Sequence, residues 1–204
     1  MCNARDLCLA NHSWNLLLNQ KLAMLAILWR QITNRIYQML PHSNELSMTV
    51  LMTPDKANFS GNVHGGDLLK LLDQVAYACA SRFAGNQVVT LSVDQVIFNQ
   101  PIHVGELVTF LASVNYTGRT SIEVGVKVIS EDILTKVVRH VNSCFITMVA
   151  MDSERRPTEV PKLLPLTEDQ QRRYRAAELR REMRGEFEDR FNRIRESESK
   201  YDWN

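Results

Sequence analysis

The chain has 204 residues, of which 45% are hydrophobic and 23% charged, as is ordinary for a globular protein with a core. Its formal net charge of +1 gives no reason to expect a nucleic-acid partner. The four cysteines, Cys2, Cys8, Cys79 and Cys144, lack metal-binding spacing, which favours free thiols in a reducing compartment and a cytoplasmic location.

The N-terminal segment, residues 1–45, is predicted to be a helical extension. Apolar residues recur in it at helical spacing: Leu18, Leu22, Leu25 and Trp29. The apolar run is shorter than the roughly 20 residues of a membrane span, and no cleavage site follows it, so neither a span nor a signal peptide is expected. The helix could dock on the protein, lie on a membrane surface, or precede the native start. We favour the last alternative, because Met24 and Met39 could each begin a shorter product.

A strand and then a long helix are predicted next. The apolar, β-branched run from Leu46 to Thr53 favours a strand. After the glycine pair Gly65-Gly66, helix formers continue to a stop signal at Gly85-Asn86. Apolar residues cover most of the circumference of this helix, which predicts that it is buried nearly all round. Asp73 lies at the edge of its one narrow polar stripe.

Four strand-like runs follow the helix, separated by short turns. They are Val89–Asp94, Val108–Tyr116, Ser121–Val128 and Lys136–Met151. The last run is long and mixed, so either both of its faces are covered or a bulge interrupts it. Short connections favour antiparallel pairing. The predicted fold class is α+β: over residues 46–161, an antiparallel sheet of five to six strands wraps around one long central helix.

A charged helical segment is predicted for residues 162–204. Three prolines precede it as an extended linker, and Thr167 to Gln170 form a capping box that opens a helix ending near Arg195. One apolar stripe runs along this helix: Met183, Phe187, Phe191 and Ile194. We interpret it as a solvated helix docked on a neighbour through that stripe rather than as a nucleic-acid binder, because its acidic and basic residues are interleaved.

Several residues around the start of the central helix could carry chemistry. Backbone N–H groups at Gly65 and Gly66 could hold a carbonyl oxygen that gains negative charge, or the glycines could simply permit a tight turn. Asp73 could activate a water as general base, or be satisfied at a subunit contact. Asn58 and Asn62, in the preceding loop, are most often turn residues in such a setting.

The sequence contains no nucleophilic-serine motif, no G-x-G-x-x-G and no phosphate-binding loop. A hydrolase of this kind would have to work without a serine nucleophile. A thioester suits that requirement, because a thiol with a pKa of about 8.5 is a good leaving group. Water, a base and an oxyanion site could then suffice.

Three segments resemble the hotdog-fold acyl-CoA thioesterases, and specifically the bacterial and brain-type cytosolic acyl-CoA hydrolases. They are A-N-F-S-G-N-V-H-G-G-D-L-L-K-L-L-D, V-T-L-S-V-D-Q-V-I-F-N-Q-P-I-H-V-G-E-L-V and V-N-Y-T-G-R-T-S. The resemblance covers about Leu46 to Pro161. It implies a hotdog fold and homodimers with two active sites at the subunit contact, often assembled as a trimer of dimers, or hexamer.

The resemblance also implies roles for particular residues. Asp73 and Asn58 would meet across the subunit contact, where Asp73 would activate water or attack the thioester carbon directly and Asn58 would position the water or carbonyl. Backbone N–H groups of Gly65 and Gly66 would hold the oxyanion, and two residues would line the pocket: Asn62 and His64. Three further residues would contact coenzyme A: Arg119, Thr120 and Ser121.

The expected function is therefore hydrolysis of fatty acyl-CoA to free acid and CoA, in fatty acid and lipid metabolism. No metal and no cofactor are expected, since coenzyme A is part of the substrate and product. Two alternatives remain open: an acyl-CoA-binding sensor without turnover, and another hotdog reaction such as hydration of an enoyl-CoA.

Overall fold

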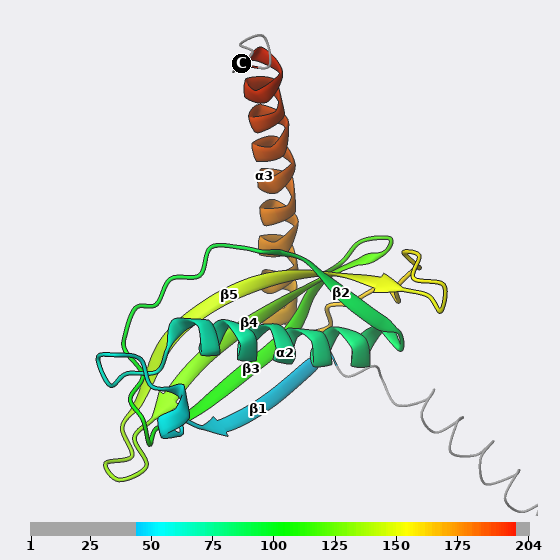
Figure 1. The fold of residues 1–204 in the computed structure, drawn as a ribbon. Coiled ribbons are helices and arrows are strands. Elements are labelled where there is room, and N and C mark those ends of the chain that lie inside the picture. The colour runs from blue at the N-terminus through cyan, green and yellow to red at the C-terminus, as the bar shows by residue number, and fades with distance from the viewer. Residues whose placement is uncertain (1–43, 199–204) are drawn as a thin grey trace, which may run out of the picture. The chain divides into compact units, whose positions relative to one another are not determined.

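A computed structural model describes the chain over residues 44–198, so residues 1–43 of the expected N-terminal extension lie outside the described residues. The elements, in order, are β1 (Glu45–Leu51), the 3-10 helix η1 (Pro54–Lys56), α2 (Gly65–Ala84), β2 (Gln87–Val93), β3 (Leu107–Thr117), β4 (Ser121–Glu131), β5 (Val138–Met151) and α3 (Glu168–Glu198). Figure 1 shows α2 lying along one face of the sheet. The predicted order of a strand, a long helix, four strands and a last helix is confirmed.

Within residues 44–198, five strands form one sheet in the order β1-β3-β4-β5-β2. Every neighbouring pair is antiparallel, as the short β3–β4 and β4–β5 connections predict. The crossover from β1 through α2 to β2 places these two strands at opposite edges of the sheet. The α+β prediction of an antiparallel sheet wrapped around a central helix is thus confirmed.

Helix α2 begins and ends where its sequence signals predict. His64 is the N-cap, and Gly85 ends the helix in the left-handed conformation with φ 70°, which glycine adopts without a steric penalty. One side of the helix packs on the sheet: Leu68, Leu72, Val75, Ala76, Cys79, Ala80, Phe83 and Ala84 are buried. The prediction of burial nearly all round is wrong for the single chain, because the sheet covers only one side. Leu69 is 42% exposed and Tyr77 44% exposed on the other side.

The mixed pattern of β5 has both of the causes that the sequence left open. A register shift between Val128 and Ile129 leaves Val141 as an extra residue in β5, which is a β-bulge. The inner side chains of β5 pack in the core beneath α2, and α3 lies over part of its outer face, where Arg180 stacks on Phe145 with the guanidinium carbon 3.5 Å from the ring centroid.

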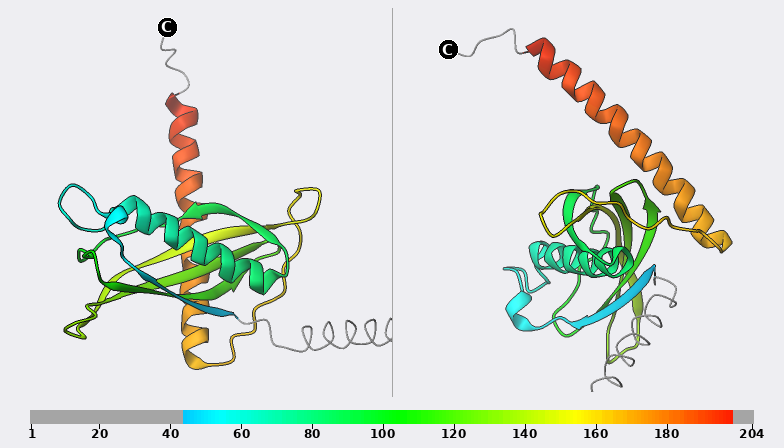
Figure 2. Two further views of the ribbon diagram at one scale, coloured as in Figure 1. Left: turned by 60° about the horizontal axis from the view of Figure 1, so that its bottom comes forward. Right: turned by 90° about the vertical axis from the view of Figure 1, so that its right-hand side faces the viewer.

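Helix α3 crosses the face of the sheet opposite α2 (Figure 2). Its capping box is confirmed: the Thr167 hydroxyl accepts from the Gln170 N–H at 3.2 Å, and the Gln170 side chain accepts from the Thr167 N–H at 3.2 Å. The helix docks through Ala177 and a row of arginines rather than through the predicted apolar stripe. Met183, Phe187, Phe191 and Ile194 are 52–70% exposed.

No helix in the described range 44–198 combines the length and the apolar character that a membrane crossing needs.

Candidate active site

Asp73 lies in the middle of α2 and faces the edge strand β2. Its side chain is half-buried, and its Oδ1 accepts a hydrogen bond of 2.6 Å from the hydroxyl of Thr90. Hydrogen bonds to ionised carboxylates are among the stronger ones in proteins, so Thr90 orients this carboxylate. Its second oxygen, Oδ2, has no hydrogen-bond partner among residues 44–198 and can accept a proton.

Thr90 was missed by the sequence reasoning, which placed no site residue on the strand run Val89–Asp94. Thr90 pairs with Met148 and Val93 pairs with Ile146, both buried partners, while the register shifts between Thr90 and Ser92. Thr90 lies two residues after the buried Val88 in regular register, so it faces α2, and the bulge at Leu91 brings Val93 to the same side. A threonine inside a strand that follows the helix was the available signal, but only the pairing of β2 with β5 decides which way it points.

Asn58 is held in a defined orientation by its own loop. Its side-chain oxygen accepts hydrogen bonds from the backbone N–H groups of Ser60, at 2.8 Å, and Asn62, at 3.1 Å. The turn role considered for this asparagine is therefore present. Because only the oxygen of the amide is engaged, the side-chain NH₂ group stays available to donate to another molecule. Asn62 itself forms an isolated β-bridge with His103.

The start of α2 presents fewer bare N–H groups than the glycine pair suggests. The Gly66 N–H donates to Nδ1 of His64 at 2.9 Å, and the Asp67 and Leu68 N–H groups donate to the His64 carbonyl. Among the described residues the Gly65 N–H has no acceptor, so this N–H group at the start of α2 remains able to donate a hydrogen bond. Phe98 lies against it: a Cβ added at Gly65 would be 3.7 Å from the Phe98 ring.

A buried ion pair anchors the segment on which the Asn58 loop rests. Arg139 donates to Glu106, which is 6% exposed and also accepts from the Ser130 hydroxyl at 2.5 Å. The loop is tied to this region through a hydrogen bond from the Val63 N–H to the Ile102 carbonyl at 2.8 Å. These contacts fix where Asn58 is presented.

The predicted site residues fall into separate places in one chain. In the described part of the protein no hydrogen bond joins Asp73 to Asn58. Residues 119–121 lie at the β3–β4 turn, where the Thr120 carbonyl accepts from the Ala150 N–H. Ala150 pairs with Val88, just after the C-terminal end of α2, whereas His64 and Gly65 lie at the other end of the helix.

The cysteines and the possible metal-binding side chains of residues 44–198 supply no further reactive group. Burial raises the pKa of the Cys79 thiol to about 12 and that of Cys144 to about 12, so both are protonated at neutral pH. Both thiols are free and buried, as predicted for small core residues. Residues 44–198 contain no group of three or more His, Cys, Asp or Glu side chains that could hold a metal ion.

Known proteins resemble this chain in both sequence and fold. The thioesterase superfamily model matches residues 60–137. Protein VdlD of Helicobacter pylori is 54% identical over 140 residues, which are 69% of this chain and 80% of the relative. The cytosolic acyl coenzyme A thioester hydrolase of Rattus norvegicus is 32% identical over 162 residues, or 76% of this chain and 42% of that longer protein.

Solved structures agree with these relatives. An apo-hexameric acyl-CoA thioesterase aligns with a TM-score of 0.69 and 36% identity, covering 72% of this chain and 94% of that one. The acyl-CoA hydrolase of Staphylococcus aureus, solved with butyryl coenzyme A and coenzyme A, aligns with a TM-score of 0.70 and 28% identity, covering 78% and 97%. This chain therefore belongs to the hotdog-fold acyl-CoA thioesterases and is a thioester hydrolase of that family.

Proposed function

We propose that this enzyme hydrolyses fatty acyl-CoA to free acid and CoA, with Asp73 as the group that activates water. The observation that carries the proposal is the half-buried carboxylate on α2, fixed by the Thr90 hydroxyl at 2.6 Å and open at Oδ2. A positioned base of this kind typically contributes about 10²- to 10⁴-fold in rate.

Residue spacing supports the same assignment. The S. aureus acyl-CoA hydrolase has been solved with alanine in place of an asparagine, of an aspartate 15 residues later, and of a threonine 17 residues after that. In this chain Asp73 follows Asn58 by 15 residues, and Thr90 follows Asp73 by 17. We therefore assign the three residues to one site.

The chemistry needs no covalent cofactor. Water attacks the thioester carbon while Asp73 of one copy takes its proton, and the Gly65 N–H at the positive end of α2 in the other copy holds the carbonyl oxygen as it gains charge. The C–S bond then breaks, and the CoA thiolate leaves and takes up a proton. Direct attack by Asp73, which expels the CoA thiolate and forms an anhydride that water cleaves, is the alternative route. Attack of water on the Asp73 carbonyl of that anhydride would leave one solvent oxygen in Asp73 itself.

In this mechanism, a second copy of the chain would complete the site. The amide of Asn58 would reach the thioester held by Asp73 and Thr90 of the partner, as a water- or carbonyl-positioning group. Since β2 is an edge strand, pairing of β2 with β2 of a second copy in antiparallel fashion would bring opposite ends of the two α2 helices together. Asn62 and His64 would then line the pocket.

The same pairing would give a place for coenzyme A. It would bring the β3–β4 turn of one copy toward the His64 end of α2 in the other. Arg119 is exposed, has the charge for a phosphate, and is flanked by the hydroxyls of Thr120 and Ser121. We propose that these three residues bind the CoA portion, and that dimers assemble further into the hexamer reported for related thioesterases.

The assignment is tested by measuring thiol release across a series of acyl-CoA chain lengths. Asp73→Asn is nearly isosteric and is expected to fold normally, to bind coenzyme A, and to lose at least about 100-fold in kcat. Asn58→Asp and Asn62→Ala serve as comparisons, the first expected to be impaired and the second to stay within a few-fold of wild type. Near-normal thiol release by Asp73→Asn would refute the assignment.

Coenzyme A binding by wild type without hydrolysis of any chain length would identify a sensor. Enoyl-CoA consumption without thiol release would identify a hydratase.

Two wider assignments accompany this function. We propose that residues 46–161 form the catalytic domain, that residues 1–45 are an N-terminal extension of which residues 1–38 can be deleted without loss of assembly or activity, and that residues 162–204 are a helical addition. A cytoplasmic location is proposed because the rat relative is named as cytosolic and the thiols of Cys79 and Cys144 are free.

A further inference from the structure

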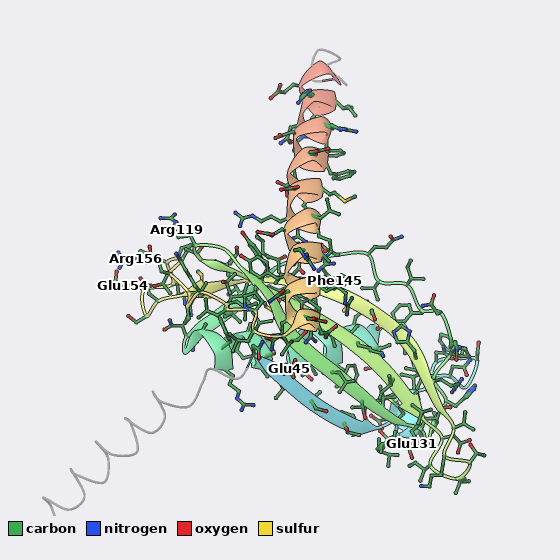
Figure 3. All side chains as sticks on the ribbon, turned by 180° about the vertical axis from the view of Figure 1, so that it is seen from behind. Glu45, Arg119, Glu131, Phe145, Glu154 and Arg156 are labelled. Carbon is green, nitrogen blue, oxygen red and sulfur yellow. The ribbon has the colours of Figure 1, made fainter. Side chains whose placement is uncertain are left out.

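Helix α3 crosses the outer face of the sheet strand by strand, toward the β2 edge. Arg173 is 2.9 Å from Glu45 of β1, and the Tyr174 ring lies 5.1 Å from that of Tyr116 in β3. Two turns after Arg173, Arg180 is 2.6 Å from Glu123 of β4, and one turn further Arg184 is 2.8 Å from Asp94, immediately after β2. Figure 3 views this face, with Glu45 near the first turns of the helix and Phe145 beside it.

The remaining turns of α3 have no sheet beneath them in the single chain. Residues 185–198 add about 20 Å of helix at 1.5 Å per residue. That length equals about four strand spacings of 4.8 Å. A helix that continues this far past β2 is therefore positioned to lie over strands that a second copy would add at that edge.

The β2 edge is built to receive such a copy. Three large apolar side chains of β2 are exposed: Val89 at 48%, Leu91 at 66% and Val93 at 47%. An exposed apolar edge strand is a ready template for pairing. The other edge, β1, instead exposes mainly polar side chains such as Glu45, Ser47 and Thr49.

The C-terminal half of α3 has an exposed apolar stripe on the side that would face a neighbouring helix. Leu179, Met183, Phe187, Phe191 and Ile194 form it, all 52–70% exposed. A pocket of about 450 Å³ opens beside it, with Phe145, Met183 and Phe187 among its lining residues. One flank carries Glu182 and Glu186 and then Arg190 and Arg193. In an antiparallel pair of these helices, the acids of one copy would meet the bases of the other.

We propose that α3 packs antiparallel against α3 of a second copy paired at the β2 edge, and so clasps the two subunits together. The contact is isologous: Phe191 and Ile194 of each copy enter the pocket formed by Phe145, Met183 and Phe187 of the other. The clasp adds an interface on the face of the sheet opposite the active site, independent of the catalytic residues.

Disulfide cross-linking tests the clasp directly. In a background with Cys2→Ser and Cys8→Ser, the double variant Gln95→Cys/Phe191→Cys is expected to form a disulfide-linked dimer on mild oxidation, because Gln95 lines the pocket that Phe191 would enter. The matched control is Gln95→Cys/Asn192→Cys. Asn192 lies on the opposite side of the helix from the stripe and should not cross-link.

Assembly provides the second measurement. Phe187→Glu/Phe191→Glu is expected to raise the dimer dissociation constant at least tenfold, or to speed subunit exchange by that factor, while Asn192→Glu changes neither. The clasp is overturned if Gln95→Cys/Phe191→Cys forms no disulfide-linked dimer and Phe187→Glu/Phe191→Glu leaves the dimer dissociation constant and the rate of subunit exchange unchanged. This holds even if the enzyme is an active dimer. The clasp is also overturned if Phe187→Glu/Phe191→Glu loses the hexamer but keeps the dimer, or loses only its binding to anionic phospholipid vesicles. Either result would mean that the stripe contacts something other than α3 of the paired copy.

Discussion

At the scale of single residues, the site depends on one hydrogen bond between a helix and a strand. The Thr90 hydroxyl, which also lies 3.4 Å from the Met148 sulfur, donates to Asp73. A donor at 2.6 Å limits the rotation of this carboxylate. Asp73 is therefore presented in one orientation, which a general base requires.

Replacing Thr90 should affect catalysis more than folding. Thr90→Val removes a hydrogen bond to a charged group, of the kind worth about 1.5–3 kcal/mol, so kcat is expected to fall about 10- to 100-fold. Thr90→Ser keeps the hydroxyl and should stay near wild type. Steady-state kinetics with one acyl-CoA substrate compares them. An equal loss in both variants would mean that the methyl group, and not the hydrogen bond, matters.

The buried thiols make a prediction about pH. Burial raises the pKa of Cys79 from 9.0 to about 12, so the folded protein keeps a proton that the unfolded chain loses above pH 9. The resulting stability is fully present below pH 9 and is lost as the pH rises toward 12. With Cys2→Ser and Cys8→Ser, no thiol should react with a thiol reagent at pH 8 until the protein is unfolded, when two should. Reaction of the native protein would contradict the burial of these side chains.

At the scale of elements, α3 is held on the sheet by a nearly buried charge. Glu123 of β4 is 2% exposed and is paired with Arg180 at 2.6 Å and Arg184 at 3.4 Å. Removing one partner of a buried pair is costly, because it leaves the other charge desolvated. The arginines thus add little net stability, but Glu123 keeps its charge paired only when α3 lies across this face of the sheet.

Breaking this contact should therefore be worse than replacing it. Arg180→Met is expected to lower the free energy of unfolding by about 2–3 kcal/mol, somewhat below the usual ~3–5 kcal/mol because Arg184 remains. Arg180→Met/Glu123→Gln should recover part of that loss, since the desolvated charge is gone. Chemical denaturation of both variants measures the difference. A double variant less stable than Arg180→Met would show that the ion pair itself contributes net stability.

At the scale of the whole molecule, the proposed site would divide its catalytic groups between two copies of the chain. The exposed apolar residues of β2, together with Leu69 and Tyr77 of α2, form a surface that a partner would cover. Asp73 and Asn58 make no contact within one chain, so the monomer would hold two incomplete half-sites. Assembly would then be a condition of catalysis and not only of stability.

Mixing inactive variants tests this division. Asp73→Ala and Asn58→Ala, unfolded and refolded together, should form mixed dimers in which one of the two sites has both native residues. Random mixing in a two-fold dimer would then restore about a quarter of wild-type activity. Each variant refolded alone is the control. Absence of any recovery, although mixed dimers are detected by mass, would place both residues in the same subunit's site.

The order of the elements, the ends of α2 and the capping box of α3 could be predicted from the amino-acid sequence, because these features depend on local signals such as Gly85 and Thr167. The motif around His64, Gly65 and Asp73 was likewise sufficient to indicate the family. The exposure of one side of α2 and the contact by which Thr90, rather than a helix residue, holds Asp73 depend on the tertiary fold. Both follow from the strand order and from the pairing of β2 with β5, which bring together residues distant in sequence, and no local periodicity encodes such pairings.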